Sequence, residues 1–97
     1  MTGKTIFRGG DMQDIFKAMA DPTRREIISI LIQQDLTVKE INQRINIPDS
    51  TLSHHLEILY RSGLVSKRKS GTFILYSASL SVLEEFIAFI SLKFTKT

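Results

Sequence analysis

Apolar residues recur every three or four positions along most of this chain, which is the spacing of amphipathic α-helices. Two shorter segments flank a Ser70-Gly71 pair, a turn signal that predicts a β-hairpin. The pattern therefore predicts a mainly α fold in the order helix, helix, helix, helix, hairpin, helix. The expected helices cover residues 12–19, 21–34, 37–45, 49–62 and 81–93, and the expected strands cover 64–69 and 72–77.

Polar residues that cap helices stand where these segments begin. An Asp before a Pro places a capping carboxylate ahead of the residue best suited to the first helical position. A Thr or Ser followed three residues later by Glu fits a capping box. Asn46 tolerates the left-handed backbone of a reversal, and Gly63 fits a helix end. The expected caps are Asp11, Asp21, Thr37 with Glu40, Asp49 or Ser50, and Ser81 with Glu84.

Composition narrows the possible functions. The 97 residues are enough for one domain, with 42% hydrophobic content and a net charge of +3. The lack of cysteine excludes disulfides and thiolate metal sites. No apolar run approaches the roughly 20 residues that cross a bilayer, and the N-terminus lacks a signal peptide's apolar region. We expect a cytoplasmic protein with a flexible arm over residues 1–10 and a folded domain over 11–97.

The segment from Thr37 to Leu59 predicts two helices joined by a tight turn. Leucines at helical spacing turn inward in the second helix, which leaves a small, polar outward side. Short side chains let a helix approach the DNA major groove, where hydroxyls and an imidazole can hydrogen-bond base edges. The alternative is an ordinary solvated helix face. The expected DNA-binding residues here are Thr37, Ser50, Thr51, Ser53 and His54.

The hairpin that follows is basic. Between Arg61 and Thr72 there are four cations and no acid. Strand alternation places Arg68 opposite Lys67 and Lys69, so the three cannot all face one duplex. Such contacts would be mainly to phosphates; alternatively, the charges protect an edge strand from aggregation. The expected DNA contacts here are Arg61, Lys67, Arg68, Lys69, Ser70, Gly71 and Thr72.

Three stretches together resemble the ArsR-type winged helix-turn-helix repressors of bacteria: DIFKAMADPTRREII (14–28), STLSHHLEILYRSGLV (50–65) and KRKSGTFILYS (67–77). The resemblance implies a homodimer that binds a pseudo-palindromic operator in double-stranded DNA and lowers transcription. Two features depart from the family pattern. Asn42 replaces a small Ala where two helices meet, so the crossing is expected to be wider or Asn42 to rotate outward. Thr72 and Leu75 replace an Arg and a Tyr of the wing, which weakens the case for minor-groove insertion by Thr72.

Metal-sensing relatives in this family carry a Cys-rich motif near Thr37, or acid and His ligands on the last helix. This chain has no Cys, and no His after His55. Adjacent helical residues project about 100° apart, so His54 and His55 cannot easily share one ion. We expect no metal and no other cofactor, and we expect His55 to be a partly buried packing or hydrogen-bonding residue.

The last helix has an apolar arc wider than one small core needs. A two-fold dimer in which the first and last helices pack against their copies would cover the remainder. The alternative is burial within a single protomer. The expected dimer residues are Met12, Ile15, Phe16, Met19, Leu83, Phe86, Ile87, Phe89 and Ile90.

No catalytic motif is present: there is no paired-carboxylate arrangement near a His, no glycine-rich phosphate loop and no H-E-x-x-H. We therefore do not expect an enzyme. The sequence leaves two alternatives to a DNA-binding repressor. One is a metal- or redox-responsive sensor of the same family, and the other is a winged-helix protein-interaction module that does not bind DNA. No effector or anti-repressor protein is implied by these residues.

Overall fold

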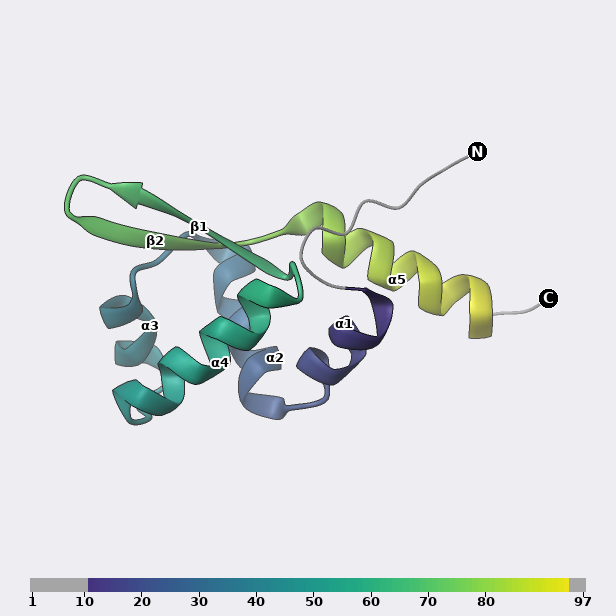
Figure 1. The fold of residues 1–97 in the computed structure, drawn as a ribbon, viewed down its shortest axis with the longest axis horizontal. Coiled ribbons are helices and arrows are strands. Elements are labelled where there is room, and N and C mark those ends of the chain that lie inside the picture. The colour runs from purple at the N-terminus through teal and green to yellow at the C-terminus, as the bar shows by residue number, and fades with distance from the viewer. Residues whose placement is uncertain (1–10, 95–97) are drawn as a thin grey trace.

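A computed structural model describes residues 11–94. The predicted order of elements and the mainly α fold are confirmed, while the predicted arm over residues 1–10 lies outside the described part. Figure 1 shows α1 to α4 packed together, with the hairpin projecting on one side and α5 running toward the other. The elements are α1 (Met12–Met19), α2 (Pro22–Gln33), α3 (Val38–Arg44), α4 (Asp49–Arg61), β1 (Val65–Ser70), β2 (Phe73–Ala78) and α5 (Leu80–Phe94).

Side-chain caps start the first three helices, as predicted. The Asp11 carboxylate accepts from the backbone N–H of Asp14 at 3.0 Å, and Asp21 accepts from that of Arg24 at 3.1 Å. Thr37 and Glu40 form a full capping box, because each side chain accepts from the other residue's backbone N–H. These bonds satisfy donors that a helix leaves unpaired at its first turn.

Two predicted caps were wrong. Helix α4 already begins at Asp49, so Pro48 is its N-cap and Ser50 lies within the first turn. The proline ring offers no capping oxygen, but the Pro48 carbonyl accepts from Leu52 N–H at 2.9 Å. Helix α5 begins at Leu80, so Ser81 lies inside it and cannot cap it with Glu84.

The hairpin register differs by one residue from the predicted turn. Ser70 pairs with Phe73, so the two-residue turn is Gly71-Thr72 and not Ser70-Gly71. Gly71 has φ +65°, a conformation that suits a residue without Cβ. The strands accordingly run one residue later than expected, over Val65–Ser70 and Phe73–Ala78.

A shared apolar core joins α1, α2, α3, α4, the base of the hairpin and the start of α5. Leu36 adds a short bridge to β2, with two backbone hydrogen bonds to Tyr76 of 2.8 and 3.1 Å. This bridge fixes the hairpin against the segment that leads into α3. The core residues are Ile15, Ala18, Ile27, Ile28, Leu31, Leu36, Ile41, Leu52, Leu56, Leu59, Leu64, Val65, Val82 and Leu83.

The turn between α3 and α4 accounts for Asn42. Its side chain is half-buried and its amide donates to the carbonyl of Ile47, which ties the end of the turn back to α3. Asn46 takes φ +33°, the left-handed side that was expected of it. Asn42 therefore does not rotate outward, because its amide has a backbone partner inside the turn.

Candidate nucleic-acid interface

Helix α4 separates its side chains as the sequence predicted. Leu52, Leu56 and Leu59 are buried in the core. Ser50, Thr51, Ser53 and His54 are all exposed, toward the N-terminal end of the helix. Short polar side chains on a supported helix leave its backbone open to close approach by a partner.

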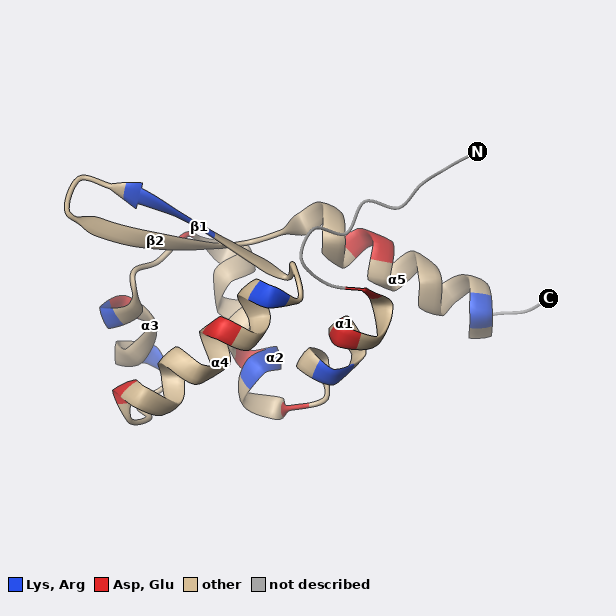
Figure 2. Ribbon diagram, in the orientation of Figure 1, with Lys and Arg blue, Asp and Glu red and all other residues tan. Residues whose placement is uncertain are grey.

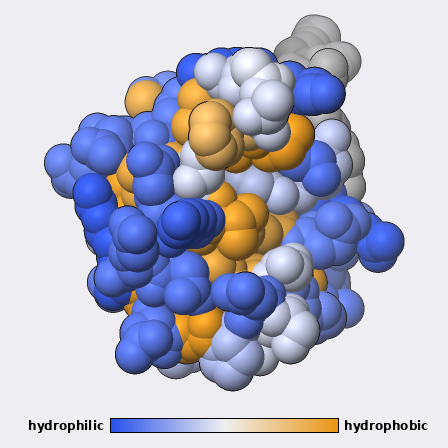
Figure 3. Space-filling view, turned by 90° about the vertical axis from the view of Figure 1, so that its left-hand side faces the viewer, coloured by the Kyte–Doolittle hydropathy of each residue, from blue (hydrophilic) through white to orange (hydrophobic). Residues whose placement is uncertain are grey.

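A groove of about 430 Å³ lies between α3 and the hairpin. Figure 3 views this end of the molecule and shows hydrophilic residues surrounding an exposed hydrophobic strip. Phe73, next to the turn, is largely exposed. This groove could not be predicted from the sequence, because its two walls, α3 and the hairpin, are far apart in the chain. Its lining residues are Thr37, Lys39, Glu40, Gln43, Ser70, Phe73 and Leu75.

Thr37 occupies one end of this groove, but its hydroxyl already has a role. Thr37 is half-buried, and its Oγ1 accepts from Glu40 N–H at 3.2 Å as part of the capping box. Thr37 therefore lies beside the hairpin, and its side chain caps the N-terminus of α3. Lys39, exposed close by in the first turn of α3, is the cation that this helix brings to the groove.

The cations of β1 divide between two faces, as alternation predicted. The Lys67 ammonium lies 4.4 Å from the centre of the Tyr60 ring. On the other face, Arg68 Nη1 donates to Asp35 Oδ2 at 2.9 Å and to Ser77 Oγ at 3.3 Å. The Arg68 hydrogen bond, followed by that of Ser77, holds the pKa of Asp35 below its ordinary value. Figure 2 shows this basic strand projecting beyond the helical body.

Lys69, Ser70, Gly71 and Thr72 complete the exposed tip of the hairpin. They lie in or next to the turn, so the structure brings them together. Arg61 does not join this surface. It ends α4, about 16 Å along the helix from Ser50, and its Nε donates to Glu57 Oε2 at 2.8 Å.

A second surface lies on α1 and α5. The Phe16 ring packs edge-on against Phe86 and Phe89, with centroids 5.2 and 6.0 Å apart. Phe16 remains partly exposed, and Ile87 is 61% exposed. Five other apolar side chains of these two helices are half-buried: Met12, Met19, Phe86, Phe89 and Ile90. Leu80, Leu92 and Phe94 are also exposed on α5, although they were not among the expected dimer residues.

Two predicted dimer residues belong to the protomer's own core. Ile15 is 0% exposed and Leu83 is 8% exposed, so neither side chain is open to a partner. Helical spacing placed both residues correctly among the apolar residues of their helices. Those apolar residues form two surfaces, one that packs in the protomer core and one that is exposed.

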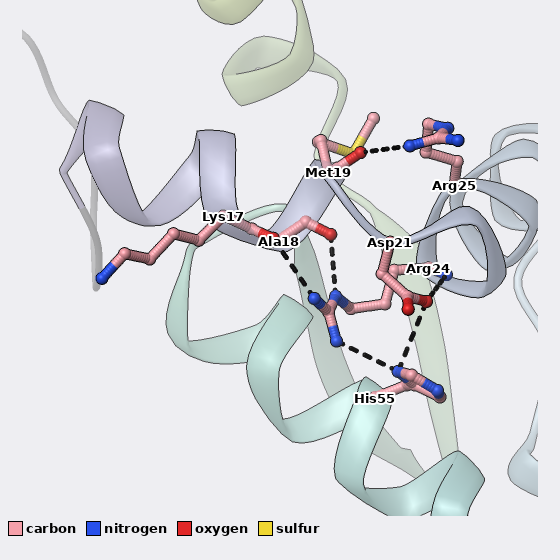
Figure 4. A network of polar contacts seen from close by, with 7 residues as sticks. All are labelled: Lys17, Ala18, Met19, Asp21, Arg24, Arg25 and His55. Carbon is pink, nitrogen blue, oxygen red and sulfur yellow. Dashed lines mark hydrogen bonds and ion pairs between the residues drawn. The ribbon is translucent and has the colours of Figure 1, made fainter.

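The DPTRR segment (21–25) ties α1 to α2. Arg24 Nε donates to the Ala18 carbonyl at 2.7 Å, and Arg25 Nη1 donates to the Met19 carbonyl at 2.8 Å. Both carbonyls belong to the last turn of α1, where a helix leaves acceptors unpaired. Figure 4 shows the Arg24 guanidinium also reaching His55 of α4. His55 is therefore a partly buried hydrogen-bonding residue, as predicted.

Residues 11–94 contain neither a candidate metal cluster nor a helix suited to cross a membrane. Within that range no three His, Cys, Asp or Glu side chains are placed to hold one metal ion. None of the helices described there is long and apolar enough to span a bilayer.

Comparison with known proteins identifies the family. Residues 21–67 match the model described as bacterial regulatory protein, arsR family. The chain is 41% identical over 76 residues to the transcriptional repressor SdpR of Bacillus subtilis, covering 78% of this chain and 84% of that protein. The chain belongs to the ArsR family. It is also 36% identical over 73 residues to the transcriptional activator HlyU of Vibrio cholerae, covering 75% of this chain and 68% of that protein.

Solved structures agree with this assignment. An ArsR-like transcriptional regulator from Rhodococcus sp. RHA1 matches with TM-score 0.77 and 28% identity, covering 82% of this chain and 76% of that one. The homodimeric winged helix-turn-helix domain Mb0332 from Mycobacterium bovis matches with TM-score 0.71 and 27% identity, covering 84% and 76%. The protein is thus a transcriptional regulator with the winged helix-turn-helix fold, and its family consists of regulators, not enzymes.

Proposed function

We propose that this regulator is a homodimeric repressor that binds a pseudo-palindromic operator, with α4 in the major groove and the hairpin along the backbone. The observation that carries the proposal is the exposed Ser50, Ser53 and His54 face on a helix whose opposite side is buried. Hydroxyls and an imidazole can donate to and accept from base edges. Repression, by occupying the operator in the bacterial cytoplasm, is supported by the likeness to SdpR.

The surface on α1 and α5 supports the proposed dimer. Exposed apolar residues of this size on two neighbouring helices are unfavourable in a soluble monomer and favour a partner surface of the same kind. A two-fold axis through this surface would present two copies of α4 to one DNA duplex. Phe16 and Ile87 are exposed apolar side chains of the two helices that this arrangement would cover.

A selection experiment tests the proposal. Purified protein is mixed with fragments of its own genome, and the retained fragments are sequenced. We expect an inverted repeat whose half-site centres lie about one helical turn, roughly 34–36 Å, or a multiple of it apart. Retention of random fragments, or of none, would contradict sequence-specific binding and favour a protein-interaction module.

The hairpin should contribute affinity without sequence preference. Lys69→Ala is expected to weaken binding to selected and scrambled duplexes alike, and to reduce the salt dependence by roughly one ion for each phosphate that the lysine neutralises. Arg68→Ala should have a smaller effect, because Asp35 already neutralises that guanidinium. Fluorescence anisotropy over a series of salt concentrations measures the DNA affinity of both variants and its salt dependence.

The matched control is Lys17→Ala, which removes an exposed cation from the last turn of α1. This variant should bind as the wild type does. If Lys69→Ala and Lys17→Ala both give the same salt dependence as the wild type, the hairpin does not contact phosphates.

A further inference from the structure

We infer that Arg24 and His55 are positioning residues that hold the DNA-reading face of α4 in place relative to α1, and that protonation of His55 releases this link. The inference rests on the proposed function, because it assigns these residues to DNA discrimination. It concerns a contact between residues 31 positions apart, both away from the exposed face of α4.

Arg24 joins three helices through one guanidinium. From α2, its Nε and Nη2 donate to the carbonyls of Ala18 and Lys17 in α1, at 2.7 and 3.2 Å. Its remaining nitrogen, Nη1, lies 3.2 Å from His55 Nδ1 in α4. An arginine guanidinium has donors in a rigid planar fork, so it can hold three acceptors at fixed angles, which a lysine cannot do. Figure 4 shows the guanidinium between the end of α1 and the His55 ring.

This contact assigns a hydrogen-bonding role to His55 Nδ1. Arginine stays protonated in proteins and offers only donors, so His55 Nδ1 must accept. An accepting nitrogen carries no proton, and the neutral ring therefore has its proton on Nε2. The His55 side chain is only 13% exposed, which limits the replacement of this bond by water.

Protonation of the ring would exchange one partner for another. A protonated Nδ1 has no lone pair for Arg24 and places a positive charge beside the guanidinium. Asp21 Oδ2 lies 3.9 Å from the same Nδ1 and can accept from it. The pKa of Asp21 is held below its ordinary value, chiefly by the Arg24 backbone N–H, so this carboxylate is available in its charged form.

Other charged groups at this junction come from α1, α2 and α4. Asp14, Lys17 and Arg61 line the same pocket as Arg24, and Arg25 donates to the Met19 carbonyl. On α4 the His54 ring lies 6.3 Å from that of His55, centroid to centroid. From α1, Lys17 contributes its carbonyl, while its side chain extends away from His55 (Figure 4). Acidification should therefore move His55 from Arg24 toward Asp21 and remove the link between α1 and α4.

A pair of variants isolates this effect. Both carry His54→Gln, so that the neighbouring imidazole does not titrate, and one also carries His55→Gln. The Gln carbonyl can accept from Arg24 but does not titrate. Affinities for the selected and scrambled duplexes are compared at about pH 7.5 and about pH 5.5, at constant ionic strength, across the range in which histidine changes charge.

The protein that retains His55 should lose discrimination by at least about fivefold on acidification, which is the low end of typical coupling between sites. The His55→Gln protein should keep its discrimination at both pH values. Arg24→Lys, which keeps the charge but not the fork, should discriminate less well already at the higher pH. Equal pH profiles of the two His54→Gln proteins would overturn the inference.

Nitrogen-15 shifts of the His55 ring provide a second measurement without DNA. Near pH 7.5 we expect an unprotonated Nδ1 and a protonated Nε2; the opposite tautomer would overturn the inference. If the wild type does not distinguish the two duplexes at that pH, the proposed function fails and the DNA role of the link fails with it. If the wild type does distinguish them but the pH profiles coincide, only the inference fails.

Discussion

Replacing Ile87 with Glu is expected to convert the protein from a dimer to a monomer. Ile87 is 61% exposed in the protomer, so the substitution should leave the fold intact. In the proposed dimer the same side chain is covered by the partner, and an unpaired carboxylate there costs several kcal/mol. Light scattering should show the mass falling to the 11.0 kDa of a single chain.

Ile32→Glu is the matched control, because Ile32 is 48% exposed and lies on α2, a helix outside the proposed α1 and α5 surface. This variant should keep the mass of a dimer, which separates disruption of the interface from a general effect of added charge. A wild type with the mass of one chain at tens of micromolar would contradict the dimer directly.

Ser53→Ala and His54→Ala are expected to reduce discrimination between base pairs by about 1–3 kcal/mol if these side chains hydrogen-bond base edges. Both residues are exposed on α4, so little change in the free energy of unfolding is expected. Each variant is titrated with duplexes that differ from the selected one at a single base pair. The reduction should be confined to particular positions of the half-site.

Ser29→Ala removes an exposed hydroxyl from α2 and serves as the control. It should bind every duplex as the wild type does. If Ser53→Ala and His54→Ala also leave all affinities unchanged, α4 is not the reading helix.

The helix starts could be predicted because their signals are local. Asp21 before Pro22, and Thr37 three residues before Glu40, combine groups that meet within a single turn. The predicted position of the hairpin turn was wrong by one residue, because the register of a hairpin depends on pairing across two strands. Ser70 is of a residue type common in turns, but its pairing with Phe73 places it in the strand.

The candidate sites were harder to predict, because they depend on contacts between residues that are distant in sequence. The pattern placed Ile15 and Ile87 in the same class of apolar helix residue, yet one is in the core and the other is exposed. Alternation correctly separated Arg68 from Lys67, but it could not reveal Asp35, which lies 33 residues away from Arg68. The Arg24–His55 contact was missed for the same reason, although His55 was expected to be a packing or hydrogen-bonding residue.

The most direct test of the central claim compares wild-type binding to the selected duplex and to a scrambled duplex of the same composition. Measured at physiological salt, the selected duplex should bind at least about a thousandfold more tightly, as specific DNA-binding proteins do. The stoichiometry should be two chains per duplex. Equal affinities, or no binding to either duplex, would contradict the assignment of α4 as a reader of DNA sequence.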